Sequence, residues 1–149
     1  MPRVKRVTME DTAILAAIEG IEAEVFSDPW SLQSIENSVC GLRTRVYAAL
    51  DDADTLMGYL FLTQVMDVAD VDNIAVAPAF RRQGVASLLL ETALDGMDAE
   101  VFLEVRASNA PAIALYQKFG FTQCGIRRNY YEKPREDALL MKRERDPHP

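Results

Sequence analysis

The chain has 149 residues, 49% of them hydrophobic, so it can bury the core of one domain without disulfides or a structural metal. Its formal net charge of -7 argues against nucleic acid as the main partner, because phosphate binding requires clustered Lys and Arg. The acidity favours cationic partners such as amines or basic peptides, although solubility alone would also account for it.

The single histidine, His148, lies in a polar tail at residues 146–149 that we expect to be disordered. A Ser-His-Asp triad, a Cys-His pair and a histidine metal site are therefore excluded, and we expect no metal. The two cysteines, Cys40 and Cys124, belong to no metal-binding spacing, and we expect reduced, buried thiols. No apolar run is long enough to span a bilayer and no signal-peptide pattern opens the chain, so we expect a cytoplasmic protein without a membrane partner.

The first half of the chain predicts a short strand at residues 4–7 and then two helices. One apolar side of the first helix, which opens at Asp11-Thr12, carries Ile14, Leu15, Ile18, Ile21, Val25 and Phe26. Residues 28–31 break that helix, and Ser31 caps the second, which runs through Val39 and ends at Gly41. Three strands follow, at residues 46–50, 56–65 and 68–76, with a turn at residues 51–54 and Pro78 after the last.

The second half predicts two more helices and three more strands. Gly84 starts a helix, and a strand follows at residues 101–105. Ser108 or Asn109 caps the last helix, which has Pro111 in its first turn and Gly120 just past its end. Strands at residues 121–131 and 138–142 complete the chain. We therefore expect one α/β (α+β) domain over residues 1–145, a mixed, mostly antiparallel sheet of about seven strands flanked by about four helices.

A basic turn joins the strand at residues 68–76 to the helix at Gly84, with the sequence Arg81-Arg82-Gln83-Gly84-Val85-Ala86. Free amides at a helix N-terminus and the positive end of the helix dipole together favour an anion. Gly84 permits close approach of a ligand, and two arginines can add charge-assisted hydrogen bonds to phosphate. The turn matches neither the dinucleotide-binding glycine motif nor the P-loop. These residues alone support a phosphate site and an ordinary strand–turn–helix connection about equally.

The turn resembles the Q/R-x-x-G-x-G/A signature of the GNAT acetyltransferases, whose defined positions fall on Arg81, Gly84 and Ala86. The resemblance implies the GNAT fold over nearly the whole chain and acetyl-CoA as cosubstrate. It implies that the pyrophosphate of coenzyme A is held by the backbone amides of Arg82, Gln83, Gly84, Val85 and Ala86. It also implies that a strand edge pairs with the pantetheine arm and orients the acetyl carbonyl, namely Ile74, Ala75 and Val76.

Glu104, in the strand at residues 101–105, and Tyr116, on the following helix, form the candidate catalytic pair. Acetyl transfer from a thioester requires that the amine loses a proton and that the departing thiolate gains one. Glu104 can take the first proton, directly or through a water, and Tyr116 can donate the second because its reference pKa is about 10. The same residues also fit a solvent-facing strand position and a core tyrosine.

The segment L-E-V-R-A-S-N-x-x-A-I-x-L-Y-x-x-x-G-F at residues 103–121 resembles the RimI family, bacterial N-terminal acetyltransferases that modify a ribosomal protein. Further blocks extend the resemblance: P-W-S from Pro29, I-R-R-N-Y-Y from Ile126 and R-E-D-A from Arg135. The resemblance implies that Glu104 is the base, Tyr116 the acid and Asn109 a contact of coenzyme A. The sequence departs most from the family pattern in the first helix and around Ser27-Asp28, where the substrate peptide would bind.

The family's peptide cleft falls here between residues 26–30 and residues 130–137. Its candidate substrate residues are Trp30, Tyr130 and Tyr131, although Trp30 fits a core anchor better. Positive residues of a basic peptide would meet the acidic side chains of the last hairpin, Glu136 or Asp137.

Three functions stay open on the sequence. The first is acetylation of a protein α-amine, which the resemblance makes the N-terminal alanine of a small-subunit ribosomal protein. The second is acetylation of a lysine or a small amine, which needs stronger deprotonation because the reference pKa of lysine is about 10.4, against about 7.7–8.0 for an α-amine. The third is a non-catalytic module that binds coenzyme A or a partner protein, and the presence of both Glu104 and Tyr116 argues against it.

Overall fold

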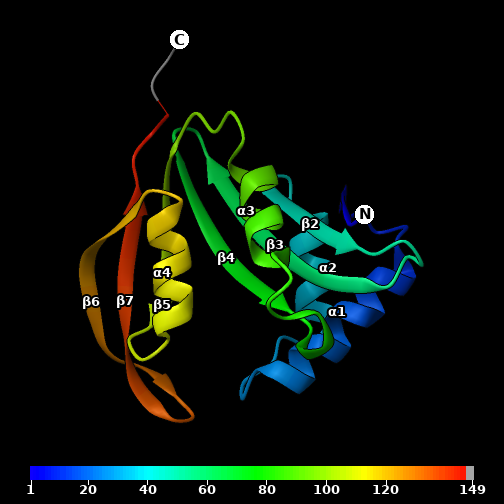
Figure 1. Ribbon diagram of the computed structural model, residues 1–149, viewed down its shortest axis with the longest axis horizontal. Coiled ribbons are helices and arrows are strands. Elements are labelled where there is room, and N and C mark those ends of the chain that lie inside the picture. Colours follow the sequence, from blue (N-terminus) through cyan, green and yellow to red (C-terminus); the bar gives the residue numbers. More distant parts are fainter. Residues whose placement is uncertain (147–149) are drawn as a thin grey trace. The chain divides into compact units, whose positions relative to one another are not determined.

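The computed structural model describes residues 1–146, and its helices and strands follow the predicted order β-α-α-β-β-β-α-β-α-β-β (Figure 1). The elements are β1 (Arg3–Arg6), α1 (Thr12–Val25), α2 (Leu32–Cys40), β2 (Thr44–Leu50), β3 (Leu56–Val65), β4 (Val68–Val76), the 3-10 helix η1 (Pro78–Phe80), α3 (Val85–Leu94), β5 (Glu100–Arg106), α4 (Ala110–Lys118), β6 (Phe121–Glu132) and β7 (Arg135–Arg143). The short helix η1 is the one addition to the prediction within the described residues.

The strands form a mixed seven-stranded sheet in the order β1-β2-β3-β4-β5-β7-β6. Strands β4 and β5 run parallel and pair only from Val68 to Asp70 on β4. The pairs β1–β2, β2–β3, β5–β7 and β6–β7 are antiparallel. The predicted fold class, a mostly antiparallel sheet of seven strands with four α-helices, is confirmed for residues 1–146.

The last strand begins at Arg135, three positions before its predicted start. Its first residues are polar, and the sequence pattern excluded them for that reason. Backbone pairing does not depend on apolar side chains, and the hairpin closes with Tyr131 opposite Glu136 and Glu132 opposite Arg135. The turn between the strands is Lys133-Pro134.

Two compact units divide the chain, and strand β4 contributes residues to both. The first unit comprises Met1–Thr63 and Asp72–Asp95, and the second comprises Gln64–Val71 and Gly96–Pro149. The assignment of residues 1–145 to one functional domain stays a prediction.

In the first unit, helices cover both faces of the strands (Figure 1). Tyr59 and Phe61 of β3 pack with α1 and α2 in a core cluster that includes Leu15, Ile18 and Ile35. Gly58, which points to the opposite face, lies under Val85 of α3. Ser31 caps α2 as predicted, because its Oγ accepts a hydrogen bond from the Ser34 amide at 3.1 Å.

In the second unit, α4 packs beside β6, and the rings of Tyr116 and Phe121 meet edge to face with centroids 5.9 Å apart. Strand β5 alternates, with Leu103 and Val105 buried and Glu104 partly exposed between them. The strand therefore has one buried, apolar face and a more polar face that carries Glu104.

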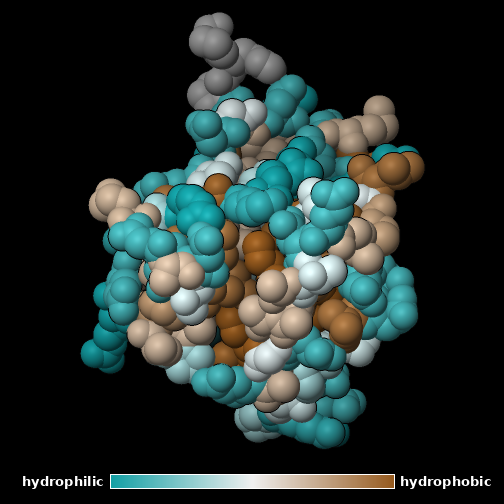
Figure 2. Space-filling view, turned by 90° about the vertical axis from the view of Figure 1, so that its right-hand side faces the viewer, coloured by the Kyte–Doolittle hydropathy of each residue, from teal (hydrophilic) through white to brown (hydrophobic). Residues whose placement is uncertain are grey.

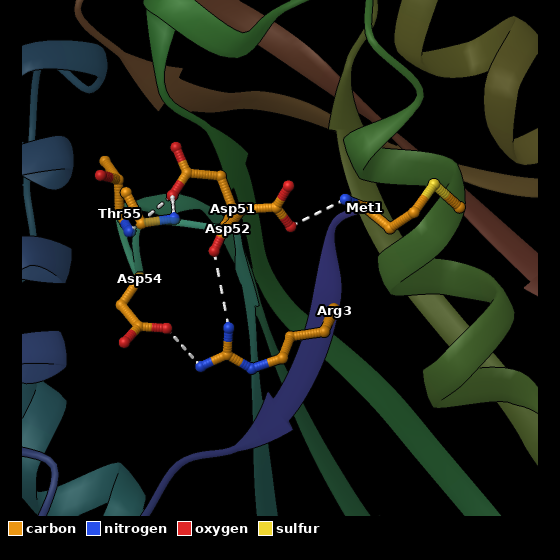
Figure 3. Close-up of polar contacts among 7 residues, drawn as sticks. Met1, Arg3, Asp51, Asp52, Asp54 and Thr55 are labelled. Atoms are coloured by element: carbon orange, nitrogen blue, oxygen red, sulfur yellow. Dashed lines mark hydrogen bonds and ion pairs between the residues drawn. The ribbon is translucent and has the colours of Figure 1, made fainter.

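Ion pairs and a hydrogen bond connect the beginning of the chain and β1 with the β2–β3 turn (Figure 3). The Met1 amine lies 2.7 Å from Asp52 Oδ1, and Arg3 Nη2 lies 2.5 Å from Asp54 Oδ1. Arg3 Nη1 also donates to the Asp51 carbonyl at 3.5 Å. Exposed pairs of this kind contribute little to stability, so backbone pairing holds β1 in the sheet.

The expectation of buried cysteines is wrong, because Cys40 and Cys124 are both free and exposed. Cys40 is the last residue of α2, a helix that buries Ile35. Cys124 lies where the β6–β7 register shifts between Gln123 and Gly125, on a strand at the end of the sheet. The expectation followed from residue type, because free cysteines are usually buried, whereas exposure depends on the position in the fold.

The described surface is largely hydrophilic on the face drawn in Figure 2, where apolar side chains show mainly near its centre. Within residues 1–146, no helix is both long enough and apolar enough to cross a membrane. Of the predicted tail, Asp146 pairs with Arg143 at 2.8 Å. The other tail residues, 147–149 with His148, lie outside the described residues, so the expected disorder stays a prediction.

Gly58 is the glycine, within the described residues, at which an added Cβ would come closer than 3.0 Å to a backbone atom. A Cβ there would lie 2.7 Å from the Ala75 carbonyl oxygen and 3.1 Å from Val85 Cγ1. We expect Gly58→Ala to lower the free energy of unfolding by about 1–3 kcal/mol, measured by urea denaturation. Gly20→Ala is the control, because nothing lies within 4 Å of a Cβ in the middle of α1. It should raise stability by about 0.5–1 kcal/mol, and equal midpoints for the two variants would contradict the close approach at Gly58.

Candidate active site

The turn before α3 contains two residues with left-handed backbone conformation. Arg82 has a φ of 64°, and Gly84, the N-cap of α3, has a φ of 75°. Left-handed residues in such a turn can direct successive amides to one side and form a concave anion site. The Gln83 side chain donates to the Ala79 carbonyl at 3.4 Å and closes the turn against η1.

The backbone amides of this turn are available to a ligand. Among the described residues, backbone hydrogen bonds in the segment stop at the Arg81 amide, which donates to Pro78, and resume at the Leu88 amide, which donates to Gly84. The amides between lack backbone acceptors, as expected at the start of a helix. Since Arg81 and Arg82 are exposed beside them, the turn fits the pyrophosphate that the sequence predicts here.

The end of β4, residues 74–76, is the predicted contact of the pantetheine arm. Strand β3 supports it, because the Ala77 amide donates to the Met57 carbonyl at 2.8 Å and Gly58 lies against Ala75. Gly58 was not among the predicted site residues. A glycine inside a strand pattern often marks close approach by another backbone, and that signal could have found it.

Glu104 forms an ion pair that was not predicted. Its Oε1 lies 3.0 Å from Arg127 Nε, and the two side chains are 25% and 56% exposed. Arg127 comes from β6, and it reaches Glu104 across β7 where the opposite residue is the small Ala138. A motif with two adjacent arginines contains a signal for such a pair, but it does not say which carboxylate is the partner.

Tyr130 and Tyr131 also lie near Glu104. The β6–β7 register shifts between Arg127 and Tyr131, and Asn129 in this bulge has a φ of 53°. A hydrogen bond with Glu104 is the largest cause of the raised pKa of Tyr130. Burial, followed by the charge of Glu104, raises the pKa of Tyr131 to about 12. The bulge thus brings both predicted substrate residues to the predicted base.

Tyr116 is a buried residue of α4, 6% exposed. Burial, followed by the interaction with Tyr131, raises its pKa to about 12. Tyr131 therefore interacts electrostatically with both members of the predicted catalytic pair. The Tyr116 phenol stays protonated below about pH 10, as a proton donor requires. The burial also agrees with the core reading, so the catalytic role stays a prediction.

One further carboxylate near Glu104 was not predicted. Asp70 is the last residue of β4 that pairs with β5, opposite Phe102. Burial and then the charge of Glu104 raise its pKa. Nothing in the local sequence pattern distinguishes Asp70 from other strand residues.

The acidic residues of the β6–β7 hairpin already have partners within the protein. Glu136 accepts a hydrogen bond from the Ser108 amide at 2.5 Å and pairs with Arg106 at 3.3 Å. A hydrogen bond from the Ser108 side chain is the largest cause that lowers the pKa of Glu136, and the Ser108 amide and Arg106 lower it further. Asp137 accepts from the Asn129 amide at 2.8 Å. These contacts hold the hairpin and the β5–α4 loop together.

Asn109 and Trp30 both have structural roles. Asn109 caps α4, since its Oδ1 accepts from the Ala112 amide at 3.3 Å. Its contact with coenzyme A stays a prediction. The hypothesis that Trp30 anchors the core is confirmed, because its ring packs on Phe61 with centroids 5.1 Å apart.

The predicted site residues fall into two groups. Glu104, Tyr116, Tyr130 and Tyr131 lie in the second unit, and the contacts above connect them. The turn, the end of β4 and Trp30 lie in the first unit.

Comparison with known proteins agrees with this architecture and defines its class. Residues 15–121 match the family model described as "Acetyltransferase (GNAT) family". The chain belongs to this family and is an acyltransferase of the N-acetyltransferase type.

Within the GNAT acetyltransferases, the relatives are those of the RimI family, as the sequence resemblance predicted. The [ribosomal protein bS18]-alanine N-acetyltransferase of Salmonella typhimurium is 40% identical, over 91% of this chain and 94% of that protein. The crystal structure of the ribosomal-protein-S18-alanine N-acetyltransferase from Escherichia coli has a TM-score of 0.88 at 34% identity, covering 100% of this chain and 97% of that one. Arabidopsis thaliana NAA60, solved in complex with acetyl-CoA, shares the fold at 20% identity with a TM-score of 0.80, over 95% of this chain and 97% of that one.

Proposed function

We propose that this protein transfers an acetyl group from acetyl-CoA to the α-amine of a protein, the N-terminal alanine of a small-subunit ribosomal protein. The observation that carries the proposal is the 40% identity, over most of both chains, with a relative named for this activity. The grouping of Glu104, Tyr116 and Tyr131 supports it. A ribosomal-protein substrate would place the enzyme in the cytoplasm.

The cosubstrate supplies the activated acetyl group as a thioester. In the proposal, the amides of residues 82–86 hold its pyrophosphate, with Arg81 and Arg82 adding positive charge. Residues 74–76 offer backbone groups to the pantetheine arm, and Asn109 contacts coenzyme A in addition to capping α4. No metal enters this scheme.

Glu104 is proposed to remove a proton from the substrate α-ammonium, directly or through a water. Arg127 lies within ion-pair distance of the same carboxylate and orients it. Tyr116 donates a proton to the departing thiolate, and its raised pKa keeps the phenol protonated at physiological pH. Tyr130 and Tyr131 line the substrate side of Glu104.

A panel of peptides incubated with acetyl-CoA and the enzyme tests the proposal by intact-mass analysis. A peptide that begins with alanine should gain one acetyl group. Its N-terminally blocked analogue with an internal lysine should gain none, because a lysine amine at neutral pH is almost fully protonated. Acetylation of the blocked peptide at an equal rate would favour a lysine acceptor and contradict the proposal. Failure to acetylate any amine would contradict it altogether.

A further inference from the structure

Glu22 is the one polar or charged residue in the buried core of residues 1–146, with 1% of its surface exposed. It lies in the last turns of α1, next to the apolar Ile21. A buried carboxylate is costly unless donors surround it. Its presence therefore requires an explanation that the proposed catalysis does not provide.

Three donors satisfy the carboxylate, each from a different part of the first unit. The Trp30 backbone amide donates to Oε1 at 2.9 Å. Tyr59 of β3 donates its hydroxyl to Oε2, and Asn73 of β4 donates its side-chain amide to the same oxygen at 2.8 Å. One side chain thus connects the α1–α2 loop with β3 and β4.

The positions of these donors give the network its significance. Trp30 belongs to the α1–α2 loop, where the family resemblance places one side of the peptide cleft. Asn73 directly precedes residues 74–76, the strand end proposed to contact the cosubstrate. The hydrogen bond to Glu22 holds the backbone amide of Trp30. The ring of Trp30 is held separately, by apolar packing on Phe61.

We propose that Glu22 is a positioning residue, whose carboxylate fixes the α1–α2 loop against β4 and so sets the shape of the peptide-binding side. This inference rests on the proposed function for its kinetic consequence. Glu22 touches no reacting atom and is not a catalytic residue. Loss of its carboxylate should loosen the loop and weaken peptide binding, and it should spare the cosubstrate turn before α3.

The test compares two replacements of Glu22. Glu22→Met keeps an unbranched chain of similar length but removes both acceptors, so the Trp30 amide loses its partner. Glu22→Gln is the conservative rescue. The new side chain keeps an oxygen that accepts from the Trp30 amide, and the Asn73 side chain can rotate so that its own oxygen accepts from the new side-chain nitrogen. Tyr59→Phe is the matched control, since it removes a buried donor to the same carboxylate and leaves the Trp30 contact intact.

With an alanine peptide, we expect Glu22→Met to raise the peptide KM about tenfold while the acetyl-CoA KM stays within about twofold of wild type. Glu22→Gln and Tyr59→Phe should keep both values close to wild type. Equal rises in both KM values, or an unchanged peptide KM in folded Glu22→Met protein, would overturn the inference. So would a Tyr59→Phe variant as impaired as Glu22→Met at similar thermal stability.

Trp30 provides a second readout that needs no activity, because it is the only tryptophan of the chain. Acrylamide quenching of its fluorescence should increase in Glu22→Met and remain unchanged in Glu22→Gln. Unchanged quenching in Glu22→Met would overturn the positioning role, whether or not any peptide is acetylated. Absence of acetylation by the wild-type protein would separately reject the proposed function. If Glu22→Met does not fold, Asn73→Ala provides the test, because it removes the hydrogen bond between Glu22 and β4. This variant should raise both the quenching of Trp30 and the peptide KM. No change in either quantity would overturn the positioning role.

Discussion

Replacing Tyr116 with phenylalanine should lower kcat by about 10²–10⁴-fold, the range that general acid catalysis supplies, while acetyl-CoA still binds. The variant removes only the hydroxyl, so the ring keeps its edge contact with Phe121. Steady-state kinetics with an alanine peptide measure the first effect. Isothermal titration with acetyl-CoA measures the second.

The pH dependence follows from the sign of the pKa shift at Tyr116. Burial and Tyr131 raise this pKa from 10.0 to about 12, so the phenol is protonated at every pH below about 10. A limb of the pH–rate profile below pH 10 therefore does not arise from Tyr116. Tyr116→Phe should lower the whole profile without moving its limbs.

Tyr47→Phe is the matched control for this variant. Tyr47 is also a buried tyrosine, 9% exposed, but it lies on β2 in the first unit. Removal of the Tyr47 hydroxyl in this variant should leave kcat near the wild-type value. If Tyr116→Phe turns over as fast as Tyr47→Phe, Tyr116 is a core residue and has no part in the mechanism.

Replacing Glu104 with glutamine should lower kcat/KM about 10²-fold near neutral pH, the lower end of the range for a general base. The loss is limited because an α-amine with a pKa of about 7.7–8.0 is partly neutral without help. The activity that remains should follow the ionisation of the amine, so the pH–rate profile should move to higher pH. Cosubstrate binding should persist.

Glu100→Gln controls for the loss of a charge on the same strand face, since Glu100 and Glu104 lie four residues apart on β5. Glu100 pairs with Lys142 at 3.6 Å, whereas Glu104 pairs with Arg127. The Glu100 variant should keep the wild-type profile. A Glu104→Gln profile identical to that of Glu100→Gln would reject Glu104 as the base.

The residues near Glu104 show why a sequence motif is an incomplete description of a site. The R-R-N-Y-Y block predicted Tyr130 and Tyr131 but not the ion pair of Arg127 with Glu104. That pair depends on the strand order β5-β7-β6 and on the bulge before Tyr131, and both are set by the return of the chain as a hairpin. A position in a motif says which residue types are present, and strand register decides which of them meet.

The sequence by itself determined the order of the elements and the local signals that start and end them. Ser31 caps α2 as predicted, Gly84 starts α3 as its N-cap, and of the two candidate caps of α4, Ser108 and Asn109, the structure has Asn109. These features depend on interactions within a few residues, so local pattern is sufficient to predict them.

Only the tertiary structure decided the contacts between residues that are distant along the chain. Glu22 meets Tyr59 and Asn73 across 37 and 51 positions, and its burial contradicts what its residue type suggests. Gly58 and Ala75 approach each other because strands β3 and β4 are neighbours, and Cys40 and Cys124 are exposed although free cysteines are usually buried. The physical reason is the same in each case: burial and partner choice depend on which surfaces the folded chain brings together, and local periodicity does not contain that information.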